Sequence, residues 1–385
     1  MSSSQPSKQK RIMIVAGEAS GDLHAAKLVK SVLAKQPDCY FYGIGGSDMR
    51  AAGVETLVDS SELAVVGIIE VLAHRKIIFG TLNRLRELLR TEPPDLLILT
   101  DYPDFNLRLA KTAKECGVKV LYYISPQVWA WRQGRVKTIR ERVDMMAVVF
   151  PFEEDFYKKH NVPVCFVGHP LLGEVEPSKS RSELLNEFNL DDDKPVVGLF
   201  PGSRKSEIKR LLSIILKSAQ QLKKTKPNLQ YVLPVASTLN TSEFSEYINE
   251  TGLDIKVIEQ RPYDAIELSD VIITVSGTVT LEIALLKTPM VIINRLSWLS
   301  YALVSRLLKI DSIGLCNIIA GEKIVPELLQ KDATIGNITA EINKILDDED
   351  YANSMKKDLS RIRGLLESDI KTEISDVVIN MLKES

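Results

Sequence analysis

The feature that most restricts the fold of this chain is a regular alternation of short apolar runs with segments of helical periodicity. The run Ile12–Ala16 is followed by a helical segment at Ala19–Leu33, and the run Asp95–Thr100 by one at Phe105–Cys116. This alternation is typical of a parallel sheet that is covered by helices on both faces. The sequence therefore predicts an α/β protein.

The same alternation continues along most of the chain. Further strands of the first half are predicted at Tyr40–Ile44, Glu55–Val58, Val118–Ile124, Met145–Val149 and Val164–Val167, and further helices at Lys76–Arg90, Trp131–Arg142 and Glu153–His160. A second half has predicted strands at Val196–Phe200, Leu229–Val235, Ile255–Ile258, Val271–Val275 and Pro289–Ile293. Its helices are predicted at Ile208–Leu222, Ser242–Glu250, Tyr263–Leu268, from Thr278 onward, and at Trp298–Leu308.

A domain boundary is predicted near residue 170, where Pro170, Pro177 and three consecutive aspartates mark a connector. We expect an N-terminal domain of residues 1–169, a second domain of residues 170–350 and a helical tail of residues 351–385 that packs back on the first domain. Two successive Rossmann-like halves imply a central cleft, because open α/β sheets bind ligands outside the carboxyl ends of their strands.

Composition excludes several classes of protein. The 385 residues carry 49 Lys and Arg against 51 Asp and Glu, so no global charge points to nucleic acid. The four cysteines are widely separated and form no C-x-x-C pair, which argues against a disulfide framework or a structural zinc. The sequence contains no run of 18 apolar residues, so it predicts no membrane-spanning helix. The run Ile12–Ala16 is too short for the apolar core of a signal peptide. We expect a cytoplasmic protein.

The turn after Val196–Phe200 predicts an anion site. The residues Pro201, Gly202, Ser203 and Arg204 lead into a predicted helix, whose free N–H groups and positive dipole end attract anions. A guanidinium at this point matches the geometry of a phosphate. The alternative is an ordinary strand–turn–helix corner with a solvated arginine.

The turn after Val271–Val275 is a second candidate for phosphate binding. Ser276, Gly277 and Thr278 are small enough to let a helix start approach a phosphate, and Glu282 lies one helical turn further along the same face. A carboxylate there can accept hydrogen bonds from ribose hydroxyls, so the set suits a nucleoside diphosphate. The alternative is a packed helix start with a solvated glutamate. Asn317 is expected in a loop, where its amide can donate to a base or a phosphate.

The corresponding turns of the first half carry carboxylates. Glu18, Ser20 and Asp22 follow the first predicted strand without the G-x-G-x-x-G spacing of a dinucleotide site, so they form either a simple helix start or a loop that holds a polar ligand. Asp101 ends the strand at Asp95–Thr100 and has no predicted capping role, and Asn106 follows in the same segment. A carboxylate at that edge is suited to deprotonating a substrate hydroxyl.

Two stretches suggest contact with lipid. Trp129, Trp131 and Arg132 open a segment that has five cations and one anion between residues 130 and 142, as expected for a membrane interface, a phosphorylated ligand or simply a solvated helix face. Single-stranded nucleic acid has no further support in the sequence. The apolar run from Leu63 to Phe79 is either core or an exposed patch for acyl chains or a bilayer.

Taken together, these motifs resemble the lipid-A-disaccharide synthase family, glycosyltransferase family 19, of GT-B fold. The resemblance covers nearly the whole chain. It is carried by Gly17–Asp22, Glu62–Leu72, Asp101–Asn106, Ser125–Arg132, Pro151–Glu153, Gly168–Pro170, Pro201–Arg204, Ser276–Thr278 with Glu282, and Asn317–Gly321. The chain departs from the family pattern at Cys316, where proline is usual, and at Asn294, where an aromatic residue is common.

The resemblance implies an inverting transfer from UDP-2,3-diacylglucosamine to 2,3-diacylglucosamine 1-phosphate, which gives a β-1,6-linked disaccharide 1-phosphate and UDP. It implies that Asp101 is the general base and that Arg204 stabilises departing UDP. The donor would be held by Gly202, Ser203, Ser276, Gly277, Thr278, Glu282 and Asn317, and the acceptor by Glu18, Ser20, Asp22, Asn106, Trp129 and Arg132.

The resemblance also implies an enzyme without a tightly bound metal and a peripheral association with anionic lipid on the inner face of the cytoplasmic membrane. We expect no cofactor and no nucleic-acid partner, and the sequence leaves open whether the chain forms a homodimer. Alternatives are another GT-B enzyme, such as a UDP-N-acetylglucosamine 2-epimerase or a peptidoglycan glycosyltransferase, and a non-catalytic nucleotide-sugar or lipid-binding protein.

Overall fold

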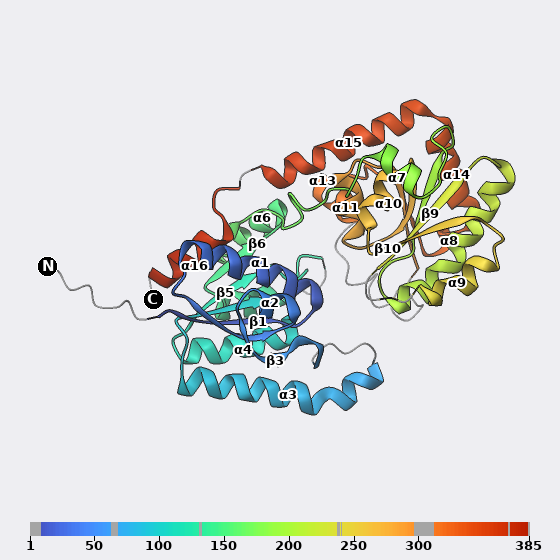
Figure 1. Cartoon of the computed structure of the whole chain (residues 1–385). Helices are drawn as coiled ribbons and strands as arrows, with labels where there is room; N and C mark the ends of the chain where they lie inside the picture. The colour runs from blue at the N-terminus through green and yellow to red at the C-terminus, as the bar shows by residue number, and fades with distance from the viewer. Residues whose placement is uncertain are drawn as a thin grey trace. The chain divides into compact units, whose positions relative to one another are not determined.

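The computed structural model describes residues 9–62, 68–130, 133–236, 239, 241–295, 312–368 and 370–383, with only the backbone described at residues 19, 68–75, 206, 242 and 243. Trp131, Arg132, the start of the apolar run and the predicted helix Trp298–Leu308 lie outside the described residues. The chain divides into two compact units (Figure 1). Unit 1 comprises Met1–Pro170 with Ser368–Ser385, and unit 2 comprises Leu171–Glu367.

Unit 1 is built on a parallel sheet with the strand order β3-β2-β1-β4-β5-β6-β7. The strands are β1 (Arg11–Ala16), β2 (Tyr40–Gly45), β3 (Glu55–Asp59), β4 (Leu96–Thr100), β5 (Lys119–Tyr123), β6 (Met145–Val148) and β7 (Val164–Phe166). The central strands β1 and β4 are almost wholly buried, because their apolar side chains pack against helices on both faces. The strand order reverses between β1 and β4, so the crevice at their carboxyl ends is the expected ligand position.

The helices of unit 1 follow the predicted alternation. They are α1 (Ala19–Lys35), α2 (Ser47–Ala51), α3 (Ile68–Thr91), α4 (Pro103–Glu115), α5 (Arg135–Arg142), α6 (Pro151–Lys159) and α16 (Ile374–Lys383). Helix α3 begins earlier than the predicted Lys76, and α5 begins later than the predicted Trp131. In Figure 1 the last helix, α16, lies beside α1, where Lys35 forms ion pairs with Glu373 and Asp376.

Unit 2 repeats the architecture with the parallel strand order β10-β9-β8-β11-β12-β13. Its strands are β8 (Val196–Phe200), β9 (Gln230–Val235), β10 (Ile255–Glu259), β11 (Val271–Val275), β12 (Met290–Asn294) and β13 (Glu327–Leu329). Its helices are α7 (Arg181–Glu187), α8 (Lys205–Thr225), α9 (Ser242–Asn249), α10 (Pro262–Leu268), α11 (Val279–Leu285), α13 (Leu315–Ala320), α14 (Ile335–Asp347) and α15 (Glu349–Glu367). Here the order reverses between β8 and β11.

Three elements of the structure differ from the expectation. Strand β13 was not predicted, because three half-buried residues carry too short a pattern to recognise. Asn317 was expected in a loop but lies in α13. The tail of residues 351–385 is not one piece, because α15 packs on α11, α13 and α14 of unit 2 whereas α16 packs on α1 of unit 1.

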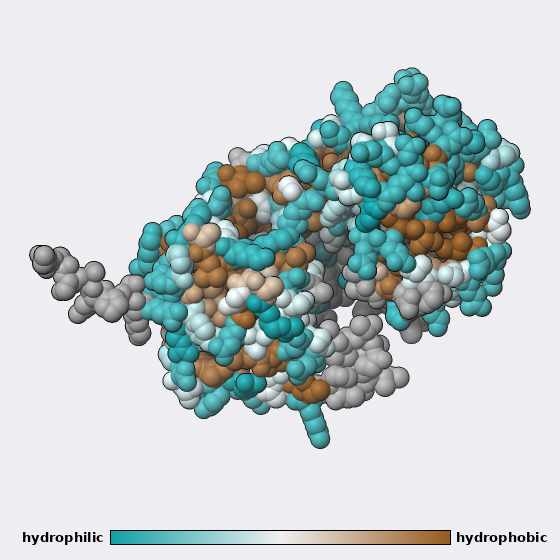
Figure 2. Space-filling view, viewed as in Figure 1, coloured by the Kyte–Doolittle hydropathy of each residue, from teal (hydrophilic) through white to brown (hydrophobic). Residues whose placement is uncertain are grey.

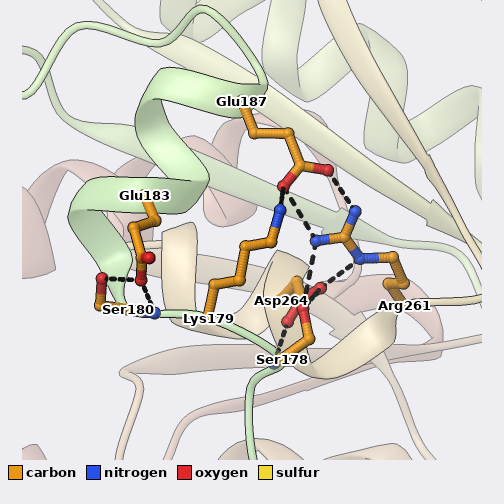
Figure 3. A network of polar contacts seen from close by, with 7 residues as sticks. All are labelled: Ser178, Lys179, Ser180, Glu183, Glu187, Arg261 and Asp264. Atoms are coloured by element: carbon orange, nitrogen blue, oxygen red, sulfur yellow. Dashed lines mark hydrogen bonds and ion pairs between the residues drawn. The ribbon is translucent and has the colours of Figure 1, made fainter.

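The start of unit 2 is fixed to α10 by a polar network (Figure 3). The buried carboxylate of Asp264 accepts hydrogen bonds from the backbone N–H of Ser178, at 2.6 Å, and from its hydroxyl, at 2.7 Å. The guanidinium of Arg261 lies between Asp264 and Glu187 and donates to both. Burial alone would raise the pKa of Asp264, but the hydrogen bonds from Ser178 and Arg261 outweigh it and lower the pKa.

The surface is mostly hydrophilic, with hydrophobic patches on both units (Figure 2). Among the described side chains, Ile77 and Phe79 on α3 are large hydrophobic groups that are more than two-fifths exposed, and the guanidinium of Arg108 lies over the Phe79 ring. Within the described residues, no helix combines the length and the apolar character needed to cross a bilayer.

Candidate functional site

The candidate site of unit 1 lies at the carboxyl ends of β1 and β4, where the turns that follow the two strands contact each other. A Cβ atom at Gly17 would lie 2.8 Å from the ring of Tyr102, so only glycine leaves room for that ring. A Cβ atom at Gly21 would lie 3.5 Å from the carboxylate of Asp101. The structure therefore brings the Gly17–Asp22 motif and Asp101 together at the point where the strand order reverses.

Asp101 and Tyr102 both adopt the left-handed backbone region, with φ values of 49° and 43°. This conformation costs a non-glycine residue free energy, and it is found where the surrounding structure enforces it. Asn106 Nδ2 donates to the carbonyl oxygens of Thr100, at 3.1 Å, and of Asp101, at 2.6 Å. The hydroxyl of Tyr122 donates to the same Asp101 carbonyl, at 2.5 Å.

The carboxyl group of Asp101 titrates far from its ordinary range. Burial is the main cause, and the nearby negative charge of Glu18 adds to it, so that the pKa of Asp101 is raised to about 6. A carboxylate that takes up a proton near neutral pH is suited to general-base catalysis.

The three predicted residues of the first turn have different environments. Glu18 is exposed at the N-cap of α1, and Ser20 is exposed inside the first helical turn, so Ser20 is not the cap. Asp22 is buried, and its carboxylate accepts hydrogen bonds from the backbone N–H groups at the start of α2: Gly46 at 2.6 Å, Asp48 at 3.0 Å and Met49 at 3.3 Å. These contacts explain Asp22 without a ligand, because it satisfies the free donors of a helix start.

Asn106 and Trp129, which were predicted to contact the acceptor, also form hydrogen bonds within the protein. Asn106 is fully buried beneath the Asp101 turn. The indole of Trp129 donates to the buried Glu153 at 3.0 Å and packs edge-on against Phe152. Burial raises the pKa of Glu153 to about 8 although hydrogen bonds oppose the shift. Trp129 is therefore a core residue, and the remaining predicted acceptor residue, Arg132, lies outside the described residues.

Unit 2 has a candidate site of its own at the carboxyl ends of β8 and β11, where its strand order reverses. Gly202 has φ of 100°, and a Cβ atom there would lie 2.5 Å from Glu207 Oε2 and 3.1 Å from Val275 at the end of β11. Glycine is thus required for the turn to approach the neighbouring strand. Ser203 is exposed, and Arg204 at the N-cap of α8 keeps 76% of its side chain exposed while it pairs with Glu207 at 3.4 Å.

The turn between β11 and α11 presents small residues, and the first turn of α11 carries the half-buried Glu282. Gly277 and Thr278 are exposed, whereas the hydroxyl of Ser276 donates to the carbonyl of Ile313 at 2.9 Å. Burial raises the pKa of Glu282 to about 7. Among the described residues, no hydrogen-bond donor contacts the Glu282 carboxylate. The described residues therefore leave the acceptor capacity of Glu282 unused.

Asn317 does not have the free amide that its predicted role requires. Its Nδ2 donates to the Val325 carbonyl and to Glu327, and its Oδ1 accepts from the N–H groups of Ile324 and Val325. The side chain is 1% exposed, so a ligand contact through it would break these bonds. We conclude that Asn317 stabilises the backbone at residues 324 and 325 through its buried side chain.

Glu327 is a residue of this site that sequence reasoning missed. Its carboxylate accepts hydrogen bonds from the N–H groups of Ile313, at 3.0 Å, and Gly314, at 2.9 Å. It thereby holds the loop whose Ile313 carbonyl binds Ser276. No local sequence signal marks Glu327, because its partners are brought to it by the pairing of β13 with β12. Within the described part of the chain, no group of His, Cys, Asp and Glu is arranged to hold a metal ion.

The chain is similar to one protein family over almost its entire length. The family model for lipid-A-disaccharide synthetase matches residues 12–379. A lipid-A-disaccharide synthase from Geobacter metallireducens is 55% identical over 374 residues, which cover 97% of each chain. One from Nitrosococcus oceani is 49% identical over 372 residues, covering 97% of this chain and 96% of the relative.

Solved structures share the fold at low identity. A UDP-GlcNAc 2-epimerase from Neisseria meningitidis, bound to UDP-GlcNAc, superposes with a TM-score of 0.65 at 12% identity and covers 97% of this chain and 100% of its own. MurG from Acinetobacter baumannii superposes with a TM-score of 0.55 at 12% identity, covering 98% and 100%. These likenesses confirm the predicted GT-B type of α/β fold.

Proposed function

Because this chain belongs to the lipid-A-disaccharide synthase family, we propose that it transfers a 2,3-diacylglucosamine unit from its UDP derivative to 2,3-diacylglucosamine 1-phosphate. The products are the β-1,6-linked lipid A disaccharide 1-phosphate and UDP. Relatives at 49–55% identity carry this name, whereas the 2-epimerases share only the fold at 12% identity. The observation that carries the proposal is the Asp101 carboxylate at the strand-order reversal of unit 1, with its pKa near 6.

In the proposed reaction, the carboxylate of Asp101 takes the proton of the acceptor 6-hydroxyl as that oxygen attacks the anomeric carbon of the donor. The new C–O bond forms as the bond between the anomeric carbon and the UDP oxygen breaks, and the electron pair leaves with UDP. Above pH 6 Asp101 is mostly ionised and able to accept this proton. The in-line displacement accounts for inversion of the anomeric centre.

The residues of unit 2 are assigned to the donor. Arg204 has an exposed guanidinium that can stabilise the negative charge that develops on the departing diphosphate. Gly202, Gly277 and Thr278 offer backbone that a diphosphate can approach closely. Glu282 accepts the ribose hydroxyls, which fits a desolvated carboxylate with no donor among the described residues.

The test is a coupled measurement of turnover and UDP binding. We expect purified protein, given both acylated sugars, to release disaccharide and UDP in equal amounts. Asp101→Ala should abolish turnover and leave the affinity for UDP nearly unchanged. Asp104→Ala is the matched control, since Asp104 lies close by in the first turn of α4 but is exposed and pairs with Arg135. Turnover of unacylated UDP-N-acetylglucosamine alone, or full activity of Asp101→Ala, would contradict the assignment.

A peripheral association with anionic membranes is part of the same proposal. It is supported by the exposed side chains of Ile77 and Phe79 on α3 and by the exposed cations Lys137 and Arg140 on α5. Exposed apolar groups and exposed cations on one unit suit a surface that combines acyl chains with negative headgroups. Sedimentation with vesicles that contain anionic lipid should therefore capture the protein, and Ile77→Ser with Phe79→Ser should weaken capture. Equal capture by neutral vesicles would argue against the electrostatic part.

A further inference from the structure

We propose that Tyr122 and Asn106 are positioning residues that fix the catalytic carboxylate by holding the backbone carbonyl of Asp101 from two sides. The inference rests on the proposed role of Asp101. The carbonyl oxygen of Asp101 accepts hydrogen bonds from the Tyr122 hydroxyl, at 2.5 Å, and from Asn106 Nδ2, at 2.6 Å.

The two donors reach Asp101 from different elements. Tyr122 lies in β5, the strand that pairs with β4, and is one of the largest fully buried side chains of the molecule. Asn106 lies in the first turn of α4 and is 0% exposed. The Asp101 carbonyl is therefore bonded both to the sheet, through Tyr122 of β5, and to helix α4, through Asn106. The peptide between residues 101 and 102 cannot rotate without breaking both hydrogen bonds.

This attachment meets a specific need of the turn. Asp101 and Tyr102 are consecutive non-glycine residues in the left-handed region, which disfavours residues with a side chain. Rotation of the 101–102 peptide is the direct route by which the turn would relax to an ordinary conformation. Because the side chain of Asp101 projects from the same residue, that relaxation would also re-aim its carboxylate away from Gly21.

The hydroxyl of Tyr122 is suited to this task because it stays protonated. Burial is the largest influence on it and raises its pKa well above the ordinary value. The hydroxyl is then a donor at every pH at which the enzyme would work. A phenylalanine would fill the same space and lack only this bond, so the hydroxyl can be tested separately from packing.

Tyr122→Phe is the first test, with Tyr231→Phe as its matched control. Tyr231 is also buried, and its hydroxyl also donates to a backbone carbonyl, that of Ala219 at 2.9 Å, but it lies in β9 of unit 2. We expect Tyr122→Phe to lower kcat about tenfold, as expected for one hydrogen bond that fixes a reacting group, with KM for both sugars changed less than about twofold. Tyr231→Phe should leave kcat within about twofold.

A double-mutant cycle shows whether Tyr122 acts through Asp101. In an Asp101→Asn background, whose residual turnover is low, Tyr122→Phe should cause no further loss. A further tenfold loss in that background, or wild-type kcat in the single variant, would overturn the positioning role. Full activity of Asp101→Asn would instead refute the proposed base, so the two failures are distinct. If Tyr122→Phe does not fold, Asn106→Ala enters the same cycle with the same expected outcomes.

Discussion

Replacement of Asp101 by asparagine should stabilise unit 1 at neutral pH while it lowers turnover to a small residual rate. The pKa of Asp101 is raised from 3.8 to about 6 in the folded protein, first by burial and then by the charge of Glu18. A raised carboxyl pKa means that the folded protein binds the proton more tightly than the unfolded chain. Its free energy of unfolding therefore falls as the pH rises from about 4 to 6, and the full penalty is present above pH 6.

The shift from 3.8 to about 6 corresponds to about 2–3 kcal/mol at pH 7.5. Asparagine has nearly the same shape and no charge, so the variant should recover about that amount. At pH 5 the folded carboxyl is mostly protonated but the unfolded one is not, and the gain should fall to roughly half. For a unit of this size, each kcal/mol raises Tm by about 2–4 °C.

The measurement is thermal unfolding of the whole chain at pH 7.5 and at pH 5, followed by tryptophan fluorescence. Trp129 and Trp131, two of the three tryptophans, belong to unit 1. Asp155→Asn, at an exposed carboxylate of the same unit, is the control and should leave Tm unchanged. If Asp101→Asn does not raise Tm at pH 7.5, or raises it as much at pH 5, then burial does not destabilise the ionised form of Asp101. The pKa of Asp101 would then not be raised.

Three further predictions concern unit 2. Gly202→Ala should lower Tm and weaken UDP binding, because its Cβ would lie 2.5 Å from Glu207 in a left-handed turn; UDP titration calorimetry with wild-type affinity would contradict this. UDP affinity of the wild-type protein should rise as Glu282 ionises through a pKa of about 7, and Glu282→Gln should bind about tenfold more weakly and keep only the pH dependence that the terminal phosphate of UDP causes; a pH profile identical to that of the wild-type protein would exclude the ribose contact. Asn317→Ala should cost about 2–4 kcal/mol in urea unfolding, since it leaves buried backbone partners unsatisfied, and a loss below about 1 kcal/mol would show that the loop reorganises without it.

The fold was largely predictable because its signals are local. Val196–Phe200 and Val271–Val275 are continuous apolar runs of strand length, and the structure confirms both boundaries. The alternation also predicted the turns at the carboxyl ends of the strands, and hence the region of Asp101, Arg204 and Ser276. Strand β13 was missed because a three-residue edge strand has no periodicity of its own.

The roles of individual polar residues were less predictable. Asp22, Asn106 and Asn317 occupy the predicted site region, yet their hydrogen bonds hold backbone in place. A polar residue next to a site has the same sequence signature whether it binds a ligand or satisfies a buried carbonyl or N–H group. Only the positions of its partners decide, and those are 5–27 residues away along the chain.

The sequence by itself determined the two parallel sheets and the turns where chemistry is possible, since periodicity and turn residues act over a few positions. Tertiary structure alone decided which side chains in those turns remain available to a ligand. Parallel pairing puts Tyr122 on β5 beside the end of β4, and it puts Glu327 on β13 beside the loop after β12. Hydrogen bonds and desolvation depend on distances in space, which residues far apart in the chain acquire only after folding.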